Sequence, residues 1–241
     1  MQAVILAAGR GTRMGELTNA APKGLMQVSG RTLLEYGFDA LPDDINEIIL
    51  VVGYLGGMIH DAFGGEYFGK RILYVEQGEA HGTAGALWSA KDVLSAGGGS
   101  ASGGKDRFIA LMCDDIYARK DVERMTKVRD WALGVQKVPA LTEGGMIVTD
   151  KKGRIMKIVE GEHDGKPGLA GTGLFALDTR IFSAPMILKA PDSVEYGLPQ
   201  TVLAASETLH IPLEAVPATR WIKITTPEDI EMAEEILGEN Q

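Results

Sequence analysis

Two glycines and two cations near the N-terminus could together bind phosphate groups. Gly9 and Gly11 follow an apolar stretch, and Arg13 and Lys23 come after them. Glycines let backbone N–H groups approach a phosphate closely, while guanidinium and ammonium groups neutralise its charge. Because two cations suit an anion with more than one phosphoryl group, the segment predicts a triphosphate-binding loop. The alternative is an ordinary loop between a strand and a helix, carrying two solvent-exposed cations.

Two widespread phosphate motifs do not fit this segment. A dinucleotide fingerprint of the form G-x-G-x-x-G needs glycine where the chain has Met14, and it needs an acid about 20 residues further on, which is absent. A Walker loop needs G-K-[S/T] after its spacer, and this is also missing. The loop is therefore of another type.

The segment resembles the first loop of the sugar-phosphate nucleotidyltransferases, which reads L-A-A-G-x-G-T-R-L-x-P-L-T-x-x-x-P-K-P. The chain follows this pattern over residues 6–13, while Met14 stands in place of its leucine and Glu16 and Gly24 replace two of its prolines. Further positions in register with the pattern are Leu17, Thr18, Pro22 and Lys23. The related cytidylyltransferases of isoprenoid synthesis and the molybdenum-cofactor nucleotidyltransferases have a shorter spacing between the arginine and this lysine. The spacing therefore matches the sugar-type enzymes.

The resemblance implies how the nucleotide is bound. Arg13 would hold the departing pyrophosphate and Lys23 the α-phosphoryl group, so both are predicted catalytic residues. Gln77 and the later segment starting at Gly82 match the family's Gln and G-T-A, and an amide can both donate to and accept from a base edge. Thr83 also fits a helix N-cap, which we favour over a ligand role. The predicted nucleotide-binding set is Leu6, Ala8, Gly9, Gly11, Thr12, Arg13, Gln77 and Gly82.

The resemblance also predicts a magnesium site. The family places an acid after the apolar strand that ends here at Met112, and Asp114 occupies that place, with Cys113 where glycine is usual. A carboxylate at the carboxyl end of such a strand lies where open α/β sheets bind ligands, and carboxylates suit Mg²⁺. We therefore predict Asp114 as the metal ligand. Asp115 remains open between a ligand, a solvated loop residue and a helix cap.

The acceptor side of the family pattern is less complete. Glu160 matches the acid that binds sugar hydroxyls, but Gly161 replaces the lysine that contacts the sugar phosphate. Thr172 lies in a segment similar to N-T-G-L-Y, in which Gly171 replaces the sugar-binding asparagine. Glu195 matches a further segment near the acceptor, although a surface acid is an equal alternative. The predicted acceptor-binding residues are Glu160, Thr172 and Glu195.

Lys223 is the largest departure from the sugar-type pattern. Those enzymes often have an aspartate two residues after the tryptophan that corresponds to Trp221, as a second Mg²⁺ ligand, and a cation cannot take that role. The isoprenoid cytidylyltransferases have a lysine in a similar I-K-x-T-x-P-E-D segment, where it orients the acceptor phosphate. We therefore predict Lys223 as a third catalytic residue that pairs with the acceptor phosphate. The alternative is a lysine whose stem packs at a strand end while its charge stays in water.

Alternating strands and helices must position these residues. Continuous apolar runs predict buried strands, and apolar residues at helical spacing predict helices between them. This pattern indicates an α/β, Rossmann-like fold with a mostly parallel sheet flanked by helices. The predicted strands are 3–7, 47–52, 71–75 and 107–112, and the predicted helices carry Leu34, Phe38 and Leu41, and then, from about Thr83, Leu87, Ala90 and Leu94.

The second half has a different pattern. Alternation on both sides of a glycine-bearing turn predicts an antiparallel hairpin over 145–159, part of a smaller antiparallel lobe that binds the acceptor. Thr226, a proline and an acid begin a predicted closing helix. The segment 95–104 contains only Ser, Ala and Gly and predicts a flexible surface loop. We expect a single domain over 1–241, with a nucleotide-binding half at about 1–130 and an acceptor-binding half at about 131–241.

Composition excludes several other classes of protein. The chain has 241 residues, a formal net charge of −9 and a single cysteine. An acidic chain does not favour non-specific binding to nucleic acid or anionic membranes, since both depend on clustered cations. The longest apolar run, 48–59, is shorter than a membrane span. One cysteine cannot form an internal disulfide, so we expect a cytoplasmic protein. The histidines show no ligand spacing.

Together these observations predict Mg²⁺-dependent nucleotidyl transfer from a nucleoside triphosphate to a sugar 1-phosphate. One alternative is cytidylyl-type transfer to a polyol or aminoalcohol phosphate, and another is a non-catalytic nucleotide-binding regulatory subunit. The expected partners are a nucleoside triphosphate and a phosphorylated small molecule. The base, the acceptor and the oligomeric state stay open.

Overall fold

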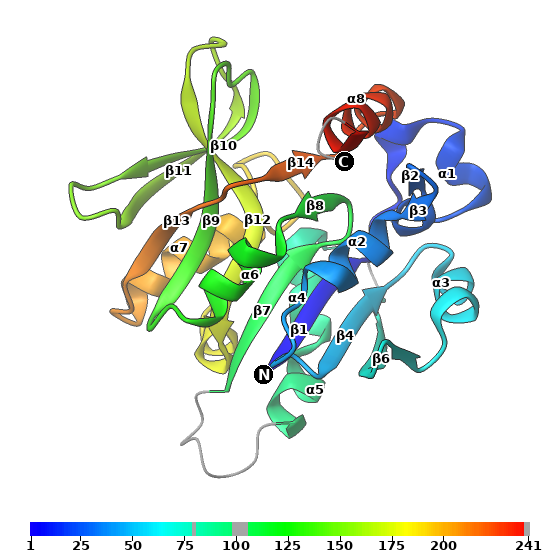
Figure 1. Ribbon diagram of the computed structural model, residues 1–241. Helices are drawn as coiled ribbons and strands as arrows, with labels where there is room; N and C mark the ends of the chain where they lie inside the picture. Colours follow the sequence, from blue (N-terminus) through cyan, green and yellow to red (C-terminus); the bar gives the residue numbers. More distant parts are fainter. Residues whose placement is uncertain (79–80, 98–105, 239–241) are drawn as a thin grey trace.

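The computed structural model describes residues 1–78, 81–97 and 106–238, and Figure 1 shows their arrangement. Four parallel strands form the centre of a ten-stranded sheet, in the order β6-β4-β1-β7. They are β1 (Gln2–Ala7), β4 (Glu47–Val52), β6 (Lys70–Glu76) and β7 (Arg107–Met112). The chain moves outward from β1 to β4 and β6, and then returns to add β7 on the other side of β1. The strand order therefore reverses between β1 and β7, and α/β sheets bind ligands at the carboxyl ends of the strands beside such a reversal.

Antiparallel strands from the second half continue the same sheet beyond β7. β12 pairs with β7 and with β9, while β10 pairs with both β11 and β12. The predicted hairpin over 145–159 is confirmed as β10 and β11. At the outer edges, β13 runs parallel to β9, and the short β5 pairs with β6. The bounds are β5 (Glu66–Tyr67), β9 (Trp131–Val138), β10 (Glu143–Thr149), β11 (Ile155–Glu162), β12 (Gly168–Asp178) and β13 (Leu213–Pro217).

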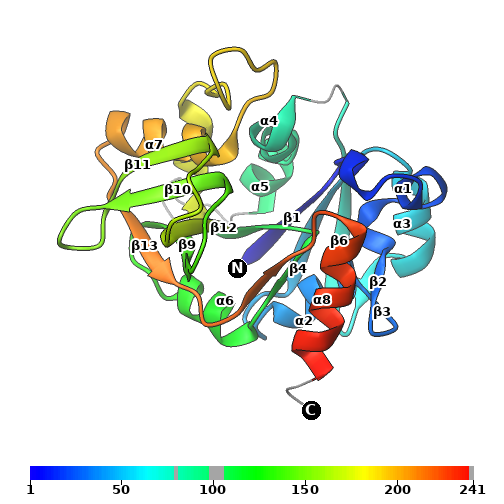
Figure 2. The same cartoon turned by 90° about the horizontal axis from the view of Figure 1, so that it is seen from above.

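Helices cover both faces of the sheet, as Figure 2 shows. On one face α4 (Gly82–Ser89), α5 (Lys91–Gly97) and α7 (Leu198–Thr208) enclose a core that includes Phe108 and Phe175. On the other face α2 (Leu33–Ala40), α3 (Gly56–Phe63) and α6 (Arg119–Thr126) pack with Ile5 and Ile48. The predicted α/β class, with a central sheet flanked by helices, is confirmed.

Two predicted elements differ in detail. The helix expected from Thr83 through Leu94 is two helices, because the backbone at Ala90 donates to Leu87 three residues back and ends α4, and Leu94 belongs to α5. The predicted flexible loop 95–104 begins inside α5, and its remaining residues 98–104 lie outside the described residues.

Short elements bring the end of the chain back to the first half. β14 (Trp221–Lys223) pairs with β8 (Asp115–Tyr117), and α8 (Pro227–Gly238) contributes Ala233 to a small separate core. The predicted start of α8 is confirmed: the Asp229 carboxylate accepts from the backbone N–H groups of Thr225 and Thr226. The first half also contains α1 (Leu17–Ala20) and the paired strands β2 (Gln27–Val28) and β3 (Arg31–Thr32). In the described part of the chain, no helix is long and apolar enough to cross a membrane.

The carboxylate of Asp121 holds the segment that leads into β14. Asp121 is 3% exposed and accepts from the backbone N–H groups of Thr219 and Arg220, at 2.7 and 3.2 Å. It also accepts from the Thr219 hydroxyl and pairs with Arg124. Since β13 ends only a few residues earlier, these bonds fix the direction in which the chain enters β14.

We expect Asp121→Ala to destabilise the fold. The substitution leaves two backbone N–H groups without their charged acceptor and removes a buried carboxylate, and the free energy of unfolding should fall by about 2 kcal/mol. Chemical denaturation measures this change. Asp43→Ala is the control, because Asp43 pairs with Arg119 from an exposed position and its loss should leave the unfolding midpoint unchanged. Equal midpoints for Asp121→Ala and the unmodified protein would contradict the anchoring role.

Candidate active site

Lys23 and Asp114 meet where the strand order reverses. Lys23 lies in a short 3₁₀ turn, Lys23–Leu25, in the segment that follows β1, and Asp114 follows β7. The Lys23 Nζ lies 2.5 Å from Asp114 Oδ2. The lysine side chain is only 9% exposed, whereas that of Asp114 is 34% exposed. The structure therefore brings the predicted α-phosphoryl lysine and the predicted metal ligand together, with the carboxylate on the solvent side.

The conformation of the first loop depends on Gly11. This residue has a φ of +65°, a left-handed conformation that favours glycine, and a Cβ here would lie 3.0–3.1 Å from the side chains of Thr18 and Lys23. The Thr18 hydroxyl donates to the carbonyl oxygens of Gly11 and Gly15, which closes the loop. Met14, in place of a fingerprint glycine, is fully buried and anchors the loop to the core.

Lys223 and Arg13 face one carboxylate that the sequence did not indicate. Glu143, the first residue of β10, has its Oε1 3.7 Å from an Arg13 nitrogen and 3.9 Å from Lys223 Nζ. All three side chains are at least 40% exposed. Two predicted catalytic cations, 210 positions apart in the numbering, thus approach the same place from different halves of the chain.

The position of Lys223 is set by the backbone of β14. The Gln136 side chain accepts from the Trp221 N–H at 3.0 Å and donates to the Trp221 carbonyl at 3.3 Å. One residue after Lys223, the Ile224 N–H donates to the carbonyl oxygen of Asp114 at 3.1 Å. These bonds hold Lys223 close to the end of β7, and none of them involves its ammonium group.

Asp115 is neither a solvated loop residue nor a helix cap. It lies in β8, is 5% exposed, and its Oδ2 lies 3.1 Å from the Tyr117 hydroxyl. Burial, together with the charge of Asp114, raises the pKa of Asp115 to about 8. Gly173 lies directly against the Asp115 carboxylate, since a Cβ at position 173 would be 3.6 Å from it. Cys113 is also buried, and burial raises the pKa of its thiol.

Gln77 and Gly82 form a second group beside α4. The Gln77 amide donates to the Gly82 carbonyl at 3.4 Å. Gly82 has a φ of +75°, and a Cβ there would lie 2.5 Å from the carbonyl oxygen of Tyr196. The N-cap prediction for Thr83 is wrong: its hydroxyl instead accepts from the N–H of Leu198, the first residue of α7. Thr83 therefore caps a neighbouring helix.

The predicted acceptor residues lie at three separate positions in the second half. Glu160 accepts from Gln200 Nε2 at 3.3 Å and lies 3.9 Å from Lys189 Nζ, so two residues missed by the sequence reasoning supply polar groups beside it. Glu195 is exposed next to Gly82. Thr172 is 1% exposed, and its Oγ1 packs against Gly134 of β9. In this structure its hydroxyl has no exposed surface to offer an acceptor.

The family of the chain follows from this geometry together with a sequence comparison. A family model for nucleotidyl transferases matches residues 2–239. The chain belongs to the nucleotidyl transferase family. The resemblance found in the first loop is confirmed, and the protein is a nucleotidyltransferase.

Individual relatives of this nucleotidyltransferase share between 22% and 30% of its residues. It is 30% identical to the UTP–glucose-1-phosphate uridylyltransferase AglF of Haloferax volcanii, over 99% of this chain and 97% of that one. It is 28% identical to the bifunctional IPC transferase and DIPP synthase of Thermococcus kodakarensis, over 98% of this chain but 50% of that protein. A Bacillus anthracis structure described as a glucose-1-phosphate thymidylyltransferase shares the fold, with a TM-score of 0.81 at 22% identity over 98% and 95% of the two chains.

The residues present fit a metal that is bound together with a nucleotide. In residues 1–78, 81–97 and 106–238, no three His, Cys, Asp or Glu side chains come together to hold a metal ion. Mg²⁺ commonly keeps several waters and takes one or two carboxylates plus phosphate oxygens of a substrate. The partly exposed Asp114 can supply one such carboxylate in the nucleotidyltransferase.

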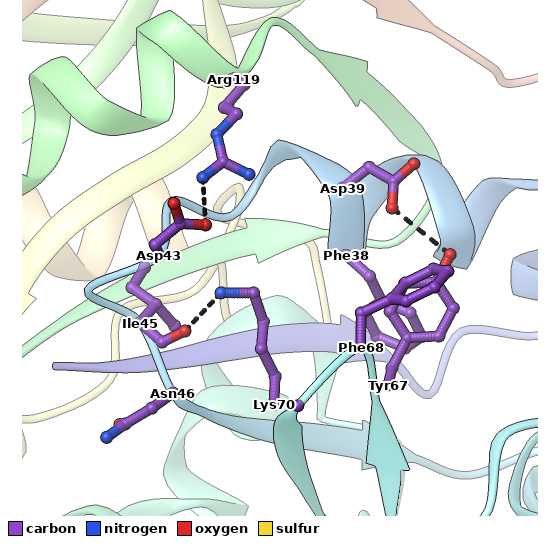
Figure 3. A pocket seen from close by; sticks show the side chains of 10 residues that line it. Phe38, Asp39, Asp43, Ile45, Asn46, Tyr67, Phe68, Lys70 and Arg119 are labelled. Atoms are coloured by element: carbon purple, nitrogen blue, oxygen red, sulfur yellow. Dashed lines mark hydrogen bonds and ion pairs between the residues drawn. The ribbon is translucent and has the colours of Figure 1, made fainter.

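A cavity of about 520 Å³ lies away from the predicted site residues (Figure 3). Its charged groups are already paired, since Arg119 donates to Asp43 at 2.6 Å and Lys70 Nζ donates to the Ile45 carbonyl at 2.6 Å. It therefore offers few free groups for a phosphate. Its lining residues are Phe38, Asp39, Asp43, Ile45, Asn46, Tyr67, Phe68, Gly69, Lys70 and Arg119.

Burial of Asp115 predicts a pH-dependent stability. Unfolded, the carboxyl loses its proton near its ordinary pKa of 3.8, but folded it keeps the proton until about pH 8. Folding therefore takes up a proton between these values, and the contribution of Asp115 to stability decreases as pH rises through this window. We expect Asp115→Asn to gain stability relative to the unmodified protein from pH 4 to pH 8, measured by urea denaturation without Mg²⁺. Parallel stability curves would contradict the burial of an ionisable Asp115.

Proposed function

We propose that the protein transfers a nucleotidyl group from a nucleoside triphosphate to a sugar 1-phosphate and releases pyrophosphate. The observation that carries this proposal is the Lys23–Asp114 pair between the ends of β1 and β7, with Arg13 and Lys223 approaching Glu143 nearby. The similarity to a glucose-1-phosphate uridylyltransferase over nearly the whole of both chains supports the choice of acceptor.

The reaction requires positioning and charge neutralisation. An oxygen of the acceptor phosphate attacks the α-phosphorus, a P–O bond forms, and the bond from the α-phosphorus to the bridging oxygen of pyrophosphate breaks. A phosphate monoester has a second pKa of about 6 and is largely a dianion at neutral pH, so no general base is needed. The protein must align the two phosphates and offset the charge of the departing pyrophosphate.

The cations divide this work. Arg13 holds the pyrophosphate, Lys23 contacts the α-phosphoryl group, and Lys223 holds the acceptor phosphate. Mg²⁺, held by Asp114 and by phosphate oxygens, would supply further positive charge on the triphosphate. Glu143 lies close to both exposed cations and must give way where phosphates bind them.

The remaining predicted residues surround the base and the body of the acceptor. Gln77 and Gly82 contact the base at the beginning of α4. Together with the first loop they form the nucleotide-binding residues of the first half. Glu160 binds acceptor hydroxyls with Lys189 and Gln200 beside it. Glu195 completes the acceptor side, in the second half of the chain, whereas Thr172 is only 1% exposed and its carbonyl already accepts from the Tyr117 hydroxyl.

A polyol phosphate is the second candidate acceptor. Lys223 stands where sugar-type enzymes often have an acid, and the similarity to an IPC transferase covers nearly the whole of this chain. An assay of pyrophosphate release distinguishes the candidates. It contains Mg²⁺, one of ATP, CTP, GTP, UTP and dTTP, and a pool of either sugar 1-phosphates or polyol phosphates. Release only with polyol phosphates would overturn the first candidate. Nucleotide binding without release for any pair would favour a regulatory subunit.

Arg13→Ala and Lys23→Ala should each lower kcat by roughly 10²–10³-fold, because each removes a preorganised donor to charge that develops in the transition state. Steady-state pyrophosphate release measures the effect, and circular dichroism checks that the variants fold. Lys151→Ala is a matched control, since Lys151 is an exposed cation in the β10–β11 turn. Near-normal turnover of either site variant would contradict the assignment.

Lys223→Ala should raise the KM for the acceptor by about 10-fold to 100-fold while leaving the KM for the nucleotide nearly unchanged, because a lost charge-assisted contact to phosphate costs about 1.5–3 kcal/mol. Since β14 is held through its backbone, the variant should fold normally. An unchanged acceptor KM would show that Lys223 is only a solvated strand-end residue.

A further inference from the structure

Arg10 is a cation of the first loop that the proposed mechanism does not use. It lies between Gly9 and Gly11, and its side chain is exposed. Its guanidinium carbon lies 4.9 Å from the centre of the Tyr54 ring. Among the described residues, no carboxylate forms an ion pair with Arg10.

The other three cations of the site differ in this respect. Lys23 is paired with Asp114, and both Arg13 and Lys223 face Glu143. A phosphate that binds one of these cations must compete with a carboxylate. A phosphate that binds Arg10 displaces none.

The backbone around Tyr54 places its ring beside the first loop. β1 and β4 are adjacent and parallel, with Ala7 opposite Val52, so both strands end at the same edge of the sheet. Gly53 then passes very close to the loop, since a Cβ there would lie 2.9 Å from the carbonyl oxygen of Ala8. The Gly56 N–H closes the turn by donating to the Gly53 carbonyl at 2.9 Å.

Stacking leaves the guanidinium free to bind an anion. The Arg10 guanidinium carbon lies over the Tyr54 ring, and this contact uses none of the N–H donors of the guanidinium. These donors match the oxygens of a phosphate in a bidentate arrangement. The ring thus limits the positions that Arg10 samples without using its hydrogen bonds.

We propose that Arg10 is a further triphosphate-binding residue and that Tyr54 is its positioning residue. The ligand is the pyrophosphate portion of the nucleoside triphosphate, and the inference rests on the proposed function for that ligand. Arg10 lies three residues before Arg13 in the same loop, so the two guanidinium groups can hold different oxygens of one pyrophosphate.

Isothermal titration of the protein with inorganic pyrophosphate, in buffer with Mg²⁺, tests the role of Arg10. Arg10→Ala should weaken binding by about tenfold, the effect of losing one charge-assisted contact. The control is Arg31→Ala, because Arg31 also stacks on a ring, that of Tyr36, but is paired with Asp39. The Arg31→Ala variant should bind pyrophosphate with unchanged affinity. Equal affinity of Arg10→Ala and the unmodified protein would overturn the proposal.

A double-mutant cycle tests the role of Tyr54. Tyr54→Ala should weaken binding by about twofold to fivefold, while Tyr54→Phe, which keeps the ring, should restore the affinity. In an Arg10→Ala background, Tyr54→Ala should have no further effect, because nothing remains for the ring to position. An equal loss in both backgrounds would overturn the positioning role.

Arg13→Ala separates this inference from the proposed function. If Arg13→Ala weakens pyrophosphate binding and Arg10→Ala does not, the inference fails while the proposed function stands. If the unmodified protein binds neither pyrophosphate nor any nucleoside triphosphate, the proposed function itself fails.

Discussion

A nearly buried lysine requires a carboxylate beside it, and this requirement joins the first loop to the end of β7. An ammonium group removed from water is costly unless it is paired, and Lys23 has Asp114 at 2.5 Å. Gly11 makes room for the lysine stem by having no side chain of its own. Because the two charged groups are also those assigned to the α-phosphoryl group and the metal, the ion pair that holds the loop also forms the centre of the proposed reaction site.

The return of β14 to this pair explains how a lysine can stand at position 223. The strand is held by the Gln136 amide, by the segment bound to Asp121, and by the bond from the Ile224 N–H to the Asp114 carbonyl. None of these contacts involves the side chain of residue 223. The strand is therefore held in place by its backbone, and the side chain of Lys223 is left to face Glu143.

Polar groups from other parts of the second half lie beside Glu160, the proposed acceptor-binding acid. Gly161 and Gly171 lack the lysine and asparagine that the family pattern leads one to expect. Lys189, which precedes α7, and Gln200, in the first turn of α7, lie close to Glu160. Polar groups thus surround the predicted hydroxyl-binding acid, although their positions in the sequence are not those of the family motif.

The sequence by itself determined the elements and the first loop. Buried strands such as 47–52 and 107–112 are continuous apolar runs, the start of α8 follows from its Pro and Asp229, and the spacing from Arg13 to Lys23 identified the family. Only the tertiary structure placed Glu143 between two cations, buried Asp115, and turned Thr83 toward α7. The physical reason is that periodicity and backbone preference act over a few neighbouring residues, whereas these contacts depend on strand order and register across the whole sheet.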